Sequence, residues 1–148
     1  MAETDNFDTV YKQYLEALKK ANNLNKTAVF DALASTVIDR IAVTFNGEGD
    51  SGQIEKTVAY KNQDPVQIPD ACLMFQSVHW GTESPTSAST PLLEAIESLC
   101  YDFLADEYGG WENNDGAFGD FTFHVPERKI ELSFNARYSE FVNHSHTL

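Results

Sequence analysis

Basic residues are scarce in this sequence, and one long stretch has none. The 148-residue chain contains 10 Lys and Arg against 23 Asp and Glu, which gives a formal net charge of −13. Between residues 62 and 127 there is no Lys or Arg at all. Because affinity for nucleic acid phosphates comes from Lys and Arg, this deficit argues against direct binding to nucleic acid.

The same stretch is rich in carboxylates, so nearly all of the net charge lies in less than half of the chain. The charges could keep the protein soluble, meet the basic surface of a protein partner, or hold a divalent cation. The sequence leaves these three interpretations open. The twelve acidic residues of the stretch are Asp64, Asp70, Glu83, Glu94, Glu97, Asp102, Asp106, Glu107, Glu112, Asp115, Asp120 and Glu127.

Long apolar runs and an apolar leader are also missing. No run approaches the roughly 20 apolar residues that cross a bilayer, and residues 1–5 are acidic, unlike a secretory signal. The only cysteines, Cys72 and Cys100, each lie in an apolar stretch, which favours buried free thiols in a reducing compartment. We therefore expect a cytoplasmic protein that has no contact with a membrane.

The chain nevertheless has the composition of a folded domain. Hydrophobic residues make up 42% and aromatic residues 12% of the sequence, which is typical of a globular protein. A chain of this length buries enough surface for one core. We expect a single domain over residues 1–148, with a polar and loose tail from about residue 139.

Three helices are predicted from apolar residues that recur at three- and four-residue steps. The first two span residues 5–21 and 26–38 and would form a helical hairpin. The third begins with Thr90 as N-cap and Pro91 in the first helical position, and it ends before the glycine pair 109–110. Its buried stripe consists of Leu92, Ile96, Leu99 and Phe103, widened by Leu93, Cys100 and Leu104.

Alternating apolar residues predict two β-hairpins. A glycine-rich loop, residues 46–52, would connect the strands of the first, whereas residues 73–80 are ambiguous and residues 81–90 look like a surface loop. The order α-α-β-β-α-β-β predicts an α+β fold, an antiparallel sheet packed by helices on one face. The paired strands would be residues 40–45 with 53–61 and residues 118–125 with 129–135.

The tetrapeptide Gly49-Asp50-Ser51-Gly52 matches the surroundings of the nucleophile in chymotrypsin-like serine proteases. In those enzymes the histidine base and the aspartate that orients it precede the serine, whereas the first histidine here, His79, follows Ser51. The chain is also too short for their two-barrel fold. We reject protease activity and expect Asp50 and Ser51 to form local bonds with the loop backbone.

A second glycine-rich loop, residues 109–120, gathers acidic and amide side chains around Trp111. An EF-hand register that places Gly116 at its sixth position puts Trp111 at the first position, where an oxygen ligand is required. Zinc spacing, a phosphate loop and a dinucleotide fingerprint are absent, and no residue pair is singled out for catalysis. Any other divalent-cation site would use Asp50, Glu112, Asp115 and Asp120.

The leading hypothesis is a small acidic, non-enzymatic protein that binds or regulates a basic protein partner, with Trp111 as the aromatic anchor. Two alternatives remain. One is a nucleic-acid mimic that inhibits a DNA-binding protein, and the other is a divalent-metal-dependent enzyme or metal-binding module. Apart from that cation no cofactor is expected, and the oligomeric state is not indicated. The partner-binding residues would be Trp111, Glu112, Asn113, Asn114 and Asp115, together with Asp50 and Ser51.

Several segments resemble a family of short bacterial proteins that is known only as a domain of unknown function. They are GDSGQIE at 49–55, LCYDFL at 99–104, GGWENNDGAFGDFTF at 109–123 and ELSFNARY at 131–138. The similarity covers roughly residues 41–138 without the middle. It implies a bacterial or mobile-element cytoplasmic protein in which both loops recur, and it supplies no activity, cofactor or catalytic residue.

Overall fold

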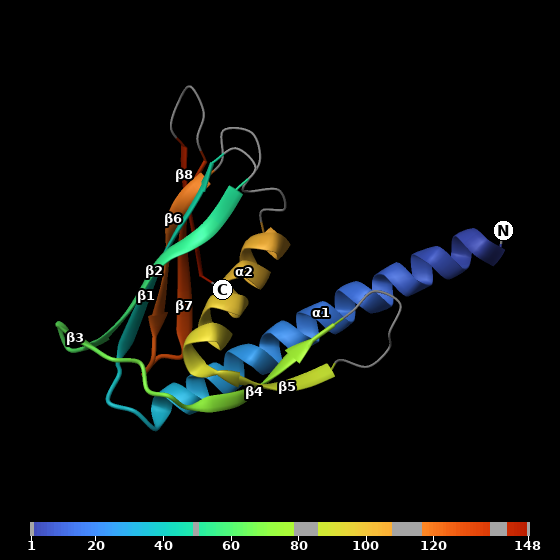
Figure 1. Ribbon diagram of the computed structural model, residues 1–148. Helices are drawn as coiled ribbons and strands as arrows, with labels where there is room; N and C mark the ends of the chain where they lie inside the picture. The colour runs from blue at the N-terminus through green and yellow to red at the C-terminus, as the bar shows by residue number, and fades with distance from the viewer. Residues whose placement is uncertain (1, 49–50, 79–85, 108–116, 137–141, 148) are drawn as a thin grey trace.

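The computed structural model describes residues 2–48, 51–78, 86–107, 117–136 and 142–147 (Figure 1). Antiparallel strands form a six-stranded sheet in the order β3-β2-β1-β6-β7-β8 and a two-stranded sheet, β4-β5. The elements are α1 (Ala2–Ala34), β1 (Arg40–Glu48), β2 (Ser51–Lys61), β3 (Asp64–Val66), β4 (Cys72–Ser77), β5 (Thr86–Pro91), α2 (Leu92–Glu107), β6 (Ala117–His124), β7 (Lys129–Ala136) and β8 (Val142–Thr147).

The two predicted hairpins, β1–β2 and β6–β7, lie side by side in the larger sheet. Pairing of β1 with β6 joins them, so that Val43 stands opposite Phe121. Figure 1 shows both helices on one side of this sheet. The predicted α+β fold, an antiparallel sheet packed by helices, is therefore confirmed.

The core lies between this sheet and α2. Alternate residues of the central strands are buried against the helix, and the residues between them are less buried, as in a sheet with one covered face. The predicted stripe of α2 supplies the other side of the core through Leu92, Ile96 and Leu99, all fully buried. The largest buried side chains of the sheet are Phe45, Phe121, Phe123, Ile41, Ile130 and Leu132.

The predicted helical hairpin is wrong, because α1 runs without interruption from Ala2 to Ala34. The sequence prediction ended one helix at residue 21 and began the next at residue 26. In the structure Asn25 is fully buried inside the helix. Its amide donates to the Gln76 carbonyl at 3.0 Å and accepts from the Gln76 N–H at 2.7 Å. These bonds with β4 outweigh the weak helix propensity of asparagine.

The glycine-rich loop predicted at residues 46–52 is mostly strand. Glu48 pairs with Ser51 and Gly47 with Gly52, so only residues 49–50 separate β1 from β2. A β-bulge between Thr44 and Phe45 shifts the register of the two strands. The end of β1 is also paired on its other side with β6, and this double pairing extends the segment.

Three further expectations are corrected at the edges of the sheets. Within the segment predicted as a loop, residues 86–91 form β5, so Thr90 and Pro91 end a strand and α2 begins at Leu92. The tail predicted to be loose contains β8, which pairs with β7. Edge strands are held by backbone hydrogen bonds and can therefore be polar in sequence. Cys72, expected to be buried, is exposed, whereas Cys100 is buried as expected.

The first half of α1 extends away from both sheets (Figure 1). Ala21 is the first residue of the helix that is buried, counting from Thr9, where the side chains begin to be described. The second half packs on β4 and α2. Within the described residues, no helix combines the length and the apolar character needed to cross a membrane.

Candidate functional site

Most of the site residues predicted from sequence lie outside the described part of the chain. This applies to Asp50 and to Trp111, Glu112, Asn113, Asn114 and Asp115, so their roles stay predictions. Ser51 begins β2, opposite Glu48. The structure does bring the flanks of the two glycine-rich segments together, because Gly47 near the end of β1 pairs with Ala117 at the start of β6.

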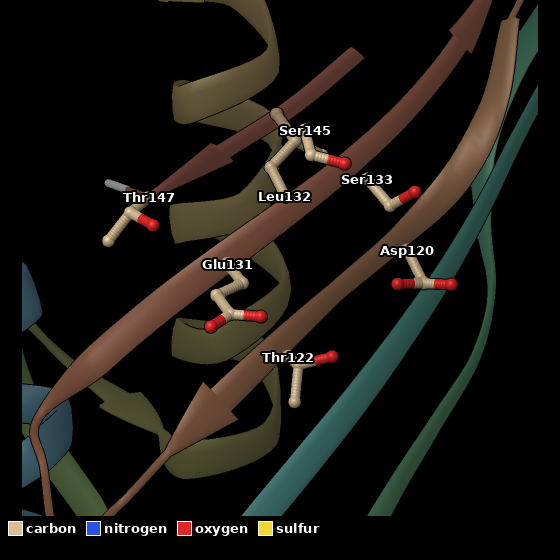
Figure 2. Close-up of a pocket in the computed structure, with 7 residues that line it drawn as sticks. All are labelled: Asp120, Thr122, Glu131, Leu132, Ser133, Ser145 and Thr147. Atoms are coloured by element: carbon tan, nitrogen blue, oxygen red, sulfur yellow. The ribbon is translucent and has the colours of Figure 1, made fainter. Parts of the chain in front are cut away.

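Asp120 is the one member of the predicted metal set whose side chain is described, and it lies on the open face of the large sheet. It faces a hollow of about 270 Å³ over β6, β7 and β8. Figure 2 shows the carboxylates and hydroxyls of this hollow, with α2 on the far side of the strands. Its lining residues are Asp120, Thr122, Glu131, Leu132, Ser133, Ser145 and Thr147.

The pairing of the strands arranges these side chains in two rows. Asp120 stands opposite Ser133, and Ser133 stands opposite Ser145. In the next row, Thr122 pairs with Glu131 and Glu131 with Thr147. Partial burial raises the pKa of Asp120 above its ordinary value. The hollow therefore offers hydroxyls and two carboxylates on a rigid surface.

This arrangement does not amount to a metal site. The Glu131 carboxylate already has close neighbours, with Lys129 Nζ at 3.4 Å and the His124 imidazole Nε2 at 3.7 Å from Oε1. Across the ranges that the structure describes, no cluster of three or more His, Cys, Asp or Glu could hold a metal ion. The metal hypothesis consequently depends on Asp50, Glu112 and Asp115, which lie outside those ranges.

A second hollow, which we call the edge groove, lies where β3 ends beside β2. It has a volume of about 470 Å³ and is formed by three separate segments of the chain. Its lining residues are Thr57, Val58, Ala59, Val66, Gln67, Ile68, Pro69, Asp70 and Leu93. Most of these side chains are apolar, and no Lys or Arg is among them.

A tight turn places β3 at this edge. Asn62 adopts a left-handed conformation with φ of 58°, which asparagine tolerates better than most residues. Its N–H donates to Asp39 Oδ2 at 2.6 Å. Pro65, within β3, cannot donate a backbone hydrogen bond and suits an edge strand. As a result β3 pairs with only the last three residues of β2, and the groove opens beyond it.

Two side chains of α2 fix the helix to β2 and set the width of the groove. Tyr101 Oη accepts a hydrogen bond of 2.8 Å from the Ile54 N–H. Thr57 Oγ1 donates to Glu97 Oε2 at 2.9 Å. Because both contacts join the helix surface to the strand, Leu93 at the start of α2 is held beside the lining residues of β2.

The groove combines an apolar floor with an acidic rim. Leu93 is 43% exposed, and Val66 and Ile68 are partly buried and pack against the core. Asp70 lines the groove and is exposed, and the exposed Glu94 directly follows Leu93. An apolar surface next to exposed carboxylates is suited to a segment that carries both aliphatic and basic side chains.

Sequence reasoning missed this groove because it placed Leu93 in the buried stripe of α2. The structure corrects that assignment. Leu93 points in nearly the same direction around the helix axis as the buried Cys100 and Leu104, but it lies in the first turn of α2 and is exposed there. The contributions of β2 and of residues 66–70 could not be anticipated, since only the sheet topology brings them to Leu93.

Burial near the middle of α2 perturbs two ionisable groups. The pKa of the Cys100 thiol is raised well above its usual value by burial and by the charges of Glu97 and Asp102, so this thiol is not an activated nucleophile. Burial also raises the pKa of Asp102 to about 6. Neither group lies in the edge groove.

We expect the variant Asp102→Asn to be more stable than the wild type at pH 7. The pKa of Asp102 is higher in the folded chain than its ordinary value of 3.8, so ionisation destabilises the fold as the pH rises from about 4 to about 6. Urea unfolding of both proteins across this range measures the difference. The difference in unfolding free energy should be smallest near pH 4 and reach a plateau above pH 6. A difference that does not vary with pH would contradict the raised pKa of Asp102.

Comparison with known proteins identifies a family. Residues 21–148 match the model of the Family of unknown function (DUF6878). Since this match spans most of the chain, the protein belongs to that family. No curated protein and no solved structure matches the chain.

Proposed function

We propose that this member of the DUF6878 family is a small acidic, non-enzymatic protein that binds a basic segment of a protein partner. The edge groove is the observation that supports the proposal, because it joins an apolar floor to an acidic rim at the β3 edge of the sheet. The partner would be a cytoplasmic protein of a bacterium or mobile element, and binding would regulate it.

The chemistry of the groove favours one kind of ligand. Aliphatic side chains of the partner would bury Leu93 and Ile68, which supplies affinity through the removal of apolar surface from water. Lys or Arg side chains would pair with Asp70 and Glu94 at the rim, which mainly orients and speeds association. An extended segment fits best, since the groove continues the line of β3 along β2.

Two features of the sequence support the proposal of a basic protein partner. The stretch from residue 62 to 127, which contains β3, the groove residues 66–70 and Leu93, has twelve acidic residues and no Lys or Arg. A partner with the opposite charge is therefore attracted to this part of the chain. Trp111 in the neighbouring sequence remains a predicted second anchor for the partner.

We expect Leu93→Asp to weaken partner binding at least tenfold, because hot-spot residues at the centre of an interface contribute about 2 kcal/mol or more. Asp70→Asn should have a smaller effect that disappears at high salt. The tagged protein is used to capture partners from extract of the source cell at low and high salt. Affinities of the captured basic partner are then measured with purified proteins.

Met74→Asp is the matched control. Met74 is an exposed apolar residue on β4, 54% accessible, and does not line the groove. The proposal predicts that Met74→Asp binds like the wild type. Equal binding by Leu93→Asp and wild type would exclude the groove. If this protein and DNA instead compete for the captured partner, the nucleic-acid mimic is favoured. If no basic partner is captured at either salt concentration, the acidic surface is reduced to a solubility device.

A further inference from the structure

Residues 2–20 of α1, which we call the arm, lie beyond the packed part of the domain. Among the side chains of α1 that are described, from Thr9 on, Ala21 is the first that is buried, and the match to the family also begins at this residue. Figure 1 shows the arm as the blue half of the helix that leads away from the sheets. The arm is thus an extension of the family domain rather than a part of its core.

The apolar face of α1 nevertheless continues along the arm. Leu15 precedes the fully buried Leu33 by about five helical turns, and Val10 precedes the buried Ala21 by about three, so each is in line with a buried residue. Val10 and Leu15 are about 140° apart around the helix axis and mark the two edges of this face. In the arm the edges of this face are accessible, with Val10 37% and Leu15 44% exposed, and Leu18 between them is partly buried. A helix face of this kind is a binding surface for another helix.

The charges along the arm indicate which kind of helix would bind this face. In sequence the arm begins with three acidic residues, at positions 3, 5 and 8, and ends with Lys19 and Lys20, while Lys12 and Glu16 lie between these two groups. The side chains of Lys19 and Lys20 are exposed. When two such helices run antiparallel, the acidic end of each lies beside the basic end of the other. A parallel arrangement would place like charges together.

We propose that the arms of two copies of this chain pack antiparallel and form a symmetric dimer. An isologous contact lets the same apolar face serve both copies. The arrangement also places the two bodies at opposite ends of the paired arms. This matters because the chain carries a net charge of −13, and repulsion between the bodies falls as their separation grows. The same charge disfavours an anionic membrane as the surface that covers the arm.

The test is the oligomeric state of the full chain by sedimentation equilibrium. We expect a concentration-dependent dimer whose dissociation constant rises at least tenfold in Leu15→Asp. The double variant Lys19→Glu/Lys20→Glu should also weaken the dimer, since it places acidic residues opposite acidic residues. Val37→Asp is the matched control: Val37 is 62% exposed, lies outside the arm, and its replacement should leave the dissociation constant within about twofold of wild type.

The direction of the arms is measured separately with spin labels in a Cys72→Ser background. Pairing of the acidic start with Lys19 and Lys20 puts the symmetry axis near Gln13. Labels at Gln13 should therefore be close together, whereas labels at Asn23 should be about 30 Å apart, from a rise of 1.5 Å per residue. Short distances at both positions would overturn the antiparallel arrangement.

Three results would overturn the proposal of a dimer. The first is a wild-type chain that stays monomeric at every concentration reached, and the second is a dimer that Leu15→Asp leaves unchanged. The third is binding of the monomer to phosphatidylglycerol vesicles that is lost in Leu15→Asp, which would assign the same face to a membrane. Circular dichroism shows whether each variant keeps its helices, as expected for an exposed position.

Discussion

The variant Gly119→Ala should lose about 3 kcal/mol or more of unfolding free energy. A Cβ atom on Gly119 would lie 1.9 Å from the Ser133 carbonyl oxygen and 3.1 Å from the ring of Phe45. The first neighbour is backbone of the paired strand β7, so the clash is relieved only if β6 and β7 move apart. Overpacking of a core costs roughly 1–3 kcal/mol where side chains can adjust, and more where they cannot.

The absence of a side chain at Gly119 leaves room for the rings of two phenylalanines. Gly119 stands opposite Phe45 on one neighbouring strand and Phe134 on the other. The two rings stack with centroids 6.2 Å apart. Substitution of this glycine therefore disturbs the backbone pairing and the aromatic packing together.

Thermal unfolding followed by circular dichroism measures the effect of Gly119→Ala. A loss of about 3 kcal/mol lowers the Tm of a chain of this size by about 10 °C. Thr122→Ala, on the open face of the same strand, is the control and should change Tm by no more than a few degrees. If Gly119→Ala had a Tm near that of the wild type, the close pairing of β6 with β7 at this point would be wrong.

The variant Asn25→Ala should cost about 2–4 kcal/mol, the second largest effect that we expect. Asn25 is fully buried, and its side chain bonds both backbone groups of Gln76. Its removal leaves a donor and an acceptor of β4 without their partner, and each partly buried polar group left unsatisfied costs about 1–3 kcal/mol. Asn25→Asp should also destabilise, because it keeps the acceptor but buries a charge.

Asn23→Ala is the matched control for Asn25→Ala. Asn23 is exposed on the same helix, so its replacement by a better helix former should leave stability unchanged or slightly raised. Urea unfolding of the wild type, Asn25→Ala and Asn23→Ala measures these differences in stability. Equal stability of Asn25→Ala and wild type would show that β4 is held to α1 by packing alone. Hydrogen exchange at the Gln76 amide reports the local contact directly.

The parts of the fold that follow from the sequence are those with a strong apolar pattern. Alternation predicts β1, β2, β6 and β7, and the stripe through Ile96 predicts α2, because these elements face one core. The missed elements are held by other forces. Continuity of α1 depends on the bond between Asn25 and Gln76, and β5 and β8 are polar strands held by backbone pairing.

The candidate site was less accessible to sequence reasoning than the fold. The acidic stretch predicts a basic partner, and that inference still supports the proposed function. The edge groove itself depends on the turn at Asn62, on the short β3 and on the position of Leu93 beside β2. These features are consequences of the topology, and no local sequence pattern predicts them.

The pairing of β1 with β6 has a consequence for how the chain is made. Each hairpin is local in sequence, whereas β1 and β6 are separated by β2 to β5 and α2. During synthesis β1 and β2 leave the ribosome well before β6 exists, and pairing across so long a connection is slow. Until then the inner edge of β1 is open to any other strand. The nascent chain is therefore most vulnerable to misassembly before β6 has been made and has paired with β1.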